Sequence, residues 1–132
     1  MKGRSNKTNM KDKSELLRNL PQFIGTEAYH RFSKLFPKTV LTDGVLYLAN
    51  NAGCYWLMDV IGSIQSIPEV KAEWFLRVTF NKAVAWVIVD DGNGNVLYKQ
   101  KIVSSTFPLD EIQLFVTEGD EGLRVVMLPS EY

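Results

Sequence analysis

His30 is the only histidine of the chain and the residue best suited to acid–base chemistry, because imidazole titrates near neutral pH. Asp59 stands within an otherwise apolar stretch, where an unpaired carboxylate would be costly to bury. Tyr55 precedes it by one helical turn on the same side. A carboxylate that orients a histidine is the core of a general-base site. His30, Tyr55 and Asp59 are therefore the candidate catalytic residues.

The same three residues also fit a closed hydrogen-bond network that ties two helices together. We favour this network over a small enzyme, because no nucleophile at a defined spacing accompanies the pair. Cys54 could be a thiol nucleophile with His30 as its base, but no cysteine-hydrolase signature surrounds it. A lone cysteine is more often a small core residue, and we interpret Cys54 in that way.

Neither a metal site nor a cofactor site is expected. A single cysteine excludes an internal disulfide and a thiolate metal cluster. The segment from Asp90 to Asn95 alternates oxygen ligands as a calcium loop does, but it lacks the later bidentate glutamate and the flanking helices. We therefore interpret it as a hairpin turn.

A second candidate site follows from strand register. If Asn81 and Lys82 form a turn, Phe80 lies opposite Ala83, and pairing Val89 with Val96 then brings the next strand alongside. This register gathers one aromatic side chain and several cations on the face away from the core: Arg77, Trp86, Lys99 and Lys101. Stacking on an aromatic ring between cations is how proteins hold single-stranded nucleic acid.

Two other interpretations of this face stay open, and together we favour them over nucleic acid. The cations and the ring could form cation–π pairs on a solvated surface. Alternatively, a second subunit or the N-terminal helix could cover the face, because the run from Ala83 to Val89 is apolar on both sides.

Helices are expected in the first half of the chain. Leu16, Leu17 and Leu20 predict a short helix capped by Ser14 and stopped by Pro21. Aromatic spacing predicts a second helix over 25–36, with Thr26 as its cap. A third covers 44–51, capped by Thr42 or Asp43, and Gly53 separates it from a fourth over 54–65. The fourth is apolar all round, which predicts burial on every side.

Five strands are expected in the second half, where the apolar period changes to two. They cover 74–80, 83–89, 95–103, 112–117 and 123–128, separated by short turns. Short connections favour an antiparallel meander. The expected fold class is therefore α+β, with N-terminal helices packed on a C-terminal five-stranded antiparallel meander sheet.

Length and charge give the domain organisation. A chain of 132 residues fits one domain. Residues 1–13 hold five basic residues against Asp12 alone, and since the whole chain has no net charge the remainder carries −4. We expect a disordered basic tail over 1–13 and a single domain over 14–132. The tail could be a nucleic-acid arm, but a solubilising terminus is favoured.

Several quoted segments together resemble one family. They are Gly25-Thr26-Glu27, the run from Leu41 to Ala49, the run from Ala52 to Asp59, Phe107-Pro108-Leu109, and the run from Met127 to Tyr132. The chain resembles a family of short uncharacterised bacterial proteins over about residues 23–132. The resemblance implies a bacterial or mobile-element setting and brings no activity.

The sequence thus favours a non-enzymatic binding or accessory protein that forms a homo-oligomer through apolar surface. No early apolar run suggests a secretory signal, and no apolar window is long enough to span a membrane, so the expected location is cytoplasmic, without a membrane partner. The alternatives are a nucleic-acid-associated protein that uses the tail and the Trp86 face, and a small enzyme that uses His30 and Asp59.

Overall fold

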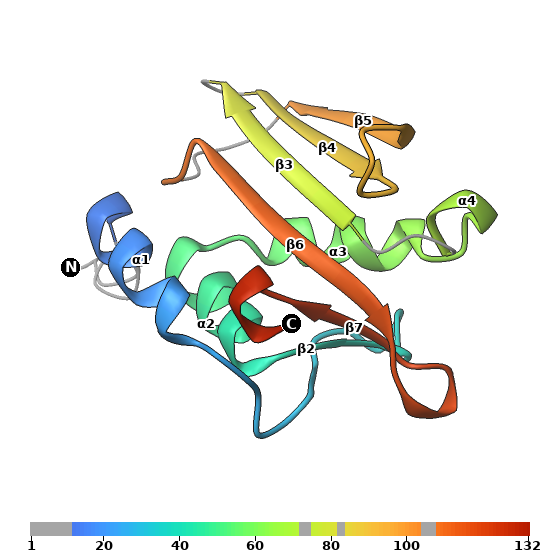
Figure 1. The fold of residues 1–132 in the computed structure, drawn as a ribbon, viewed down its shortest axis with the longest axis horizontal. Coiled ribbons are helices and arrows are strands. Elements are labelled where there is room, and N and C mark those ends of the chain that lie inside the picture. Colours follow the sequence, from blue (N-terminus) through green and yellow to red (C-terminus); the bar gives the residue numbers. More distant parts are fainter. Residues whose placement is uncertain (1–11, 72–74, 82–83, 104–107) are drawn as a thin grey trace.

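The computed structural model describes residues 12–71, 75–81, 84–103 and 108–132 (Figure 1). Its helices are α1 (Lys13–Asn19), α2 (Asp43–Ala52), α3 (Tyr55–Ile64) and α4 (Pro68–Lys71), with 3-10 turns η3 (Leu20–Gln22), η4 (Asp120–Gly122) and η5 (Pro129–Glu131). Its strands are β1 (His30–Arg31), β2 (Thr39–Leu41), β3 (Phe75–Asn81), β4 (Val84–Asp90), β5 (Val96–Val103), β6 (Glu111–Glu118) and β7 (Arg124–Met127). The α+β class is confirmed.

The predicted five-stranded meander is wrong. The strands form one seven-stranded mixed sheet in the order β1-β2-β7-β6-β3-β4-β5, in which β2 and β7 are parallel. β6 pairs with β3 and not with β5, so β3 becomes an inner strand whose Val78 is fully buried. A meander would have left β3 at an edge. Two very short strands, β1 and β2, complete the sheet, and they carry no periodic signal in the sequence.

The predicted β3–β4 register is displaced by two residues. Phe80 lies opposite Ala85, not Ala83, because Asn81 continues the strand and pairs with Val84. The residues between them, 82–83, lie outside the described part of the chain, as does Trp74 of the predicted strand. Since side chains alternate with a period of two, a displacement of two residues leaves every side chain on its predicted face.

The first helix begins two residues earlier than predicted, at Lys13, and its cap is Asp12 instead of Ser14. The Asp12 carboxylate accepts a hydrogen bond from the Glu15 amide at 2.9 Å, whereas Ser14 lies inside the helix. The third predicted helix is confirmed as α2, with Thr42 as its cap and Gly53 in the left-handed conformation at its end (φ 63°). Glycine adopts that conformation without steric cost.

The predicted helix over 25–36 is wrong, because this segment is extended and contains β1. Thr26 does not cap a helix here. Its hydroxyl donates to the Ala28 carbonyl at 2.7 Å and accepts the Asp43 amide at 2.9 Å. These contacts tie the segment to the start of α2, and Tyr29, which should have faced the core, is 52% exposed.

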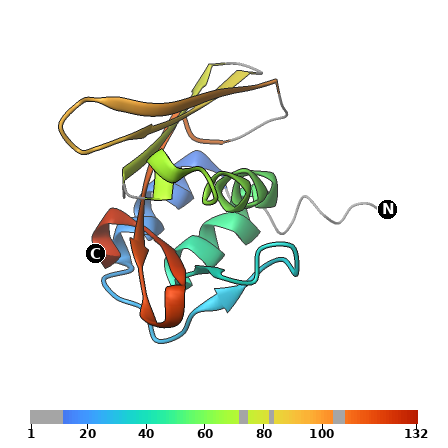
Figure 2. The same cartoon turned by 90° about the vertical axis from the view of Figure 1, so that its right-hand side faces the viewer.

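The fourth predicted helix is confirmed as α3, but its expected burial on every side is wrong. Leu57, Met58 and Ile61 are fully buried against the sheet and α2, whereas Tyr55, Asp59 and Ser63 are exposed. These three fall four residues apart and form one polar stripe. Figure 2 shows α2 and α3 together on one side of the strands.

Among the described residues, none of the helices combines the length and the apolar character that a membrane span needs.

β7 joins the two halves of the chain. The Val126 carbonyl accepts the Thr42 amide at 3.1 Å, and the Arg124 amide donates to the Lys38 carbonyl at 2.7 Å. The buried Arg124 side chain donates through Nε to the amide oxygen of Gln65, at the end of α3, at 3.0 Å. β7 therefore links β2 to β6 within the sheet and ties the end of α3 to it.

Candidate functional site

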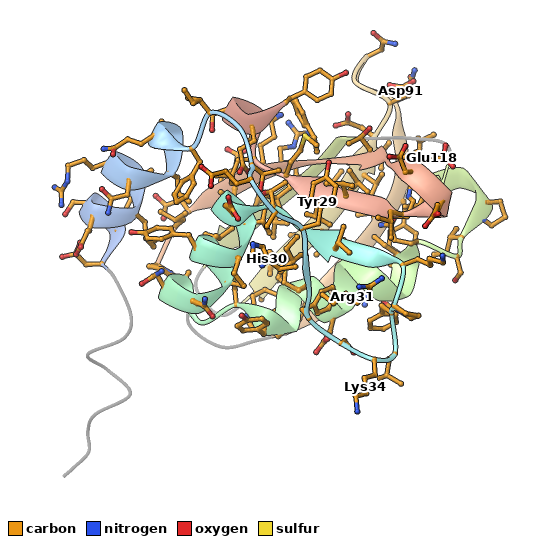
Figure 3. The ribbon with its side chains drawn as sticks, turned by 90° about the horizontal axis from the view of Figure 1, so that it is seen from below. Tyr29, His30, Arg31, Lys34, Asp91 and Glu118 are labelled. Atoms are coloured by element: carbon orange, nitrogen blue, oxygen red, sulfur yellow. The ribbon has the colours of Figure 1, made fainter. Side chains whose placement is uncertain are left out.

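His30 binds a carboxylate, but not the predicted one. Its Nε2 atom lies 2.7 Å from Oδ1 of Asp43, the first residue of α2. Both side chains are about one third exposed, at 31% and 32%. Figure 3 shows Tyr29, His30 and Arg31 in succession on the segment that carries β1. The histidine–carboxylate pair of the sequence analysis thus forms with a different acid.

Asp43 is a fixed acceptor and not a mobile base. The hydrogen bond from His30, followed by the one from the Glu27 amide, lowers the pKa of the Asp43 carboxyl. The Glu27 amide donates to Oδ2 at 2.9 Å, so both carboxylate oxygens are engaged. The position at the helix N-terminus favours the ionised form as well. The sequence analysis considered Asp43 only as a helix cap. The signal that could have identified it as a partner for His30 was an acid at the start of a predicted helix.

Tyr55 and Asp59 lie on the exposed stripe of α3, away from the buried side of that helix. The Tyr55 hydroxyl donates to the Asn50 side-chain oxygen at 2.7 Å. Solvation of Asp59 removes the cost of burial that made it a candidate. The structure therefore joins His30 to Asp43, while Tyr55 and Asp59 belong to a separate surface.

Cys54 is fully buried at the junction of α2 and α3. Its thiol donates to the Leu48 carbonyl at 3.8 Å. Burial raises the pKa of the Cys54 thiol to about 12, so the reactive thiolate is not populated at neutral pH. The interpretation of Cys54 as a core residue is confirmed.

The segment from Asp90 to Asn95 is a turn, as predicted. Oδ1 of Asp90 accepts the Gly92 amide and Oδ1 of Asp91 accepts the Asn93 amide, both at 2.8 Å. Gly92 and Gly94 have positive φ angles, 82° and 92°, which the turn requires. Within the described part of the chain, no three His, Cys, Asp or Glu residues gather so as to hold a metal ion.

Three of the segments that carried the family resemblance, those with Thr26, Thr42 and Glu131, meet at the start of α2. One carboxylate, that of Glu131, accepts the Thr42 hydroxyl at 2.6 Å and the Leu128 amide at 3.0 Å, while its second oxygen accepts the Gly44 amide at 3.0 Å. A Cβ on Gly44 would lie 2.6 Å from Cδ1 of Leu128 and 2.7 Å from Oε1 of Glu131, so a larger residue here would displace this carboxylate. This cluster positions α2 against η5, and its polar groups are already paired with one another.

The side of β3–β6 turned away from the helices forms a second candidate site, here called the open face. The residues of the open face alternate with core residues along each strand: Arg77, Thr79, Val84, Trp86, Ile88, Lys99, Lys101, Glu111 and Gln113. In Figure 1, β6 and the end of β3 pass in front of α3, and β4 and β5 lie above it. Val84, Trp86 and Ile88 are half-buried, and the charged ends on β5 and β6 are exposed.

The open face brings together the four predicted binding residues. Trp86 lies opposite Lys101 and Ile88 opposite Lys99, two residues from the predicted register and on the predicted face. The Lys99 ammonium lies over the Trp86 ring, 4.6 Å from its centroid. Arg77 instead approaches Asp90, with Nη2 and Oδ2 3.6 Å apart. Three of the four groups, those of Arg77, Trp86 and Lys99, therefore already have partners within the chain.

A family model, described as a family of unknown function (DUF6876), matches residues 14–132. The chain belongs to this family. The predicted resemblance is confirmed, and the match reaches further toward the N-terminus than the expected 23–132. No curated protein and no solved structure matches the chain. The family is one of unknown function, so the activity has to be argued from the site.

Proposed function

We propose that this protein is a non-enzymatic binding protein that self-associates through the open face. The observation that supports this is the apolar centre of that face: Val84, Trp86 and Ile88 lie on β4, whose other side, with Ala85 and Val87, is in the core. An inner strand that is apolar on both sides is normally covered on both. Within the described residues, α2 and α3 cover only one side, and on the other side Tyr132, after η5, packs on Phe115 of β6 and leaves β4 uncovered.

An enzymatic role has less support. The His30–Asp43 pair resembles part of a general-base site, but both oxygens of Asp43 are engaged in holding the segment before β1 against α2. The one cysteine is buried with a raised pKa. We therefore assign the pair a positioning role.

Nucleic-acid binding is the second candidate, supported by the Trp86 ring beside Lys99 and Lys101. Against it, Lys99 occupies the ring face on which a base would stack, and Arg77 is close to Asp90. If single strands bind here, affinity should fall steeply with salt and Trp86→Ala should weaken it at every salt concentration. Absence of binding at low salt would end this candidate.

Self-association is tested by sedimentation equilibrium over the micromolar range. Ile88→Glu should shift the protein toward monomer, because it places a charge at the centre of the open face. The variant should still fold, since Ile88 lies between Arg77 on β3 and Lys99 on β5, and both can pair with a glutamate. Leu35→Glu is the matched control, because Leu35 is 82% exposed and does not belong to the open face. A strictly monomeric wild type would refute the proposal. A bacterial, cytoplasmic setting stays a prediction.

A further inference from the structure

The open face is arranged in two rows that run across the strands. One row contains Glu111, Thr79, Trp86 and Lys101, taken from β6, β3, β4 and β5 in turn. The other contains Gln113, Arg77, Ile88 and Lys99 in the same order. Neighbouring strands lie about 4.8 Å apart, so each row is about 14 Å long. The acidic end of the first row is on β6, and the basic end of both rows is on β5.

This charge distribution selects among the ways in which two copies can pack. A two-fold pair of sheets that meet face to face with their strands aligned has its axis in the plane between them, close to the strand direction or to the direction across the strands. With the axis along the strands, β5 lies over the partner's β6 and each row faces the same row of the partner. Lys101 then meets the partner's Glu111, and Trp86 meets the partner's Thr79.

With the axis across the strands, β5 lies over the partner's β5. Lys101 then meets the partner's Lys99, and four cations gather without an acid between them. Like charges placed directly opposite each other are destabilising. The first arrangement gives two opposite-charge pairs at the rim, and the second gives two repulsive ones.

Edge-to-edge pairing through β5 is disfavoured by the same residues. β5 is an edge strand of the sheet, and a two-fold antiparallel pair of β5 strands centred on Gln100 would place Lys99 beside the partner's Lys101. The pairing of β5 with its neighbour β4 is also irregular, between Val89 and Asp90. Lysines and bulges are the devices by which proteins protect sheet edges.

We propose that two copies associate face to face about a two-fold axis parallel to β3–β6, with Lys101 of each copy against the partner's Glu111. This inference rests on the proposed self-association and specifies its geometry. Trp86, Ile88 and the stem of Arg77 fill the centre, and the two charge pairs lie at opposite rims. A face only four strands wide is at the small end of stable interfaces, so the dissociation constant should be micromolar.

The test uses two charge reversals, Lys101→Glu and Glu111→Lys, measured by sedimentation equilibrium. Each variant alone places like charges at both rims, and each should weaken the dimer about tenfold. An equimolar mixture of the two variants should regain wild-type affinity, because both rim pairs are then opposite in charge. Lys34→Glu is the control: it is an exposed cation on the turn after β1 and should change nothing.

The outcomes separate the two proposals. If wild type is monomeric, self-association itself fails. If wild type is a dimer that Ile88→Glu disrupts but neither reversal affects, the arrangement is overturned while the proposed function stands. If Lys101→Glu alone strengthens the dimer, the axis lies across the strands and the arrangement is again overturned.

Discussion

Removal of the Glu131 side chain should destabilise the fold more than any other change to an exposed or half-buried polar group described above. Its carboxylate accepts three hydrogen bonds, from the Thr42 hydroxyl and from the Gly44 and Leu128 amides. It also lies at the N-terminus of α2, where a negative charge is favourable. Glu131→Ala would leave two backbone amides without their acceptor.

The magnitude follows from these contacts. Hydrogen bonds to a charged group contribute about 1.5 kcal/mol each at the low end, which suits a cluster that is only part-buried, and water can replace some of them. We expect Glu131→Ala to lower the free energy of unfolding by about 3 kcal/mol. At a denaturant dependence of about 1.5 kcal/mol per molar urea, the midpoint would fall by about 2 M.

Urea denaturation followed by tryptophan fluorescence measures this shift. Glu131→Gln keeps one acceptor oxygen and should give about half of the loss. Ser130→Ala, on the exposed neighbouring residue, is the matched control and should stay within about 0.5 kcal/mol. A double-mutant cycle with Thr42→Ala should show a coupling of about 1 kcal/mol. If Glu131→Ala stays within the range of the control, the cluster does not stabilise α2 and the reasoning is refuted.

Three further predictions concern residues in other parts of the fold. Because the pKa of Asp43 is lowered below its ordinary 3.8, its contribution to stability is complete above that pH and is lost as the pH falls through the lowered value. In urea titrations, wild type and Asp43→Asn should therefore converge in acid, and a constant difference would contradict this. Gly62→Ala should destabilise α3 by about 1 to 2 kcal/mol in thermal unfolding, because its Cβ would lie 2.6 Å from the Phe36 ring; Gly25→Ala, with open space around it, should not. Cys54 should react with a thiol reagent only in denaturant, and rapid labelling of the native protein would disprove its burial.

The sequence predicted the five strands β3–β7 and two of the capped helices because their signals are local. Thr42 and Gly53 bracket α2 with a side-chain cap and a left-handed glycine, and both are readable from residue type. The alternation over 74–80, carried across the predicted turn, likewise placed Trp86 and Ile88 on one face, and along β4 these residues alternate with buried ones. An error of two residues in register did not change that face.

The failures concern interactions between distant segments. Tyr29, Phe32 and Phe36 have helical spacing, but the Thr26 and Asp43 contacts hold their segment extended, and sequence spacing cannot represent such a contact. β2 has three residues and is defined only by its pairing with β7. The apolar neighbours of Asp59 suggest a buried helix, although the four-residue spacing of Tyr55, Asp59 and Ser63 indicates a polar stripe.

The position of β7 between β2 and β6 also bears on how the protein is made. Thr42 and Glu131 are separated by 89 residues, and the parallel β2–β7 pair joins segments almost as distant. During synthesis, β2 therefore has no neighbour on one side, and the amides at the start of α2 have no acceptor, until the last strand emerges from the ribosome. Contacts this remote slow folding, and a nascent chain would display two unpaired strand edges during that interval. Chaperone dependence and sensitivity to C-terminal truncation are the expected cellular consequences.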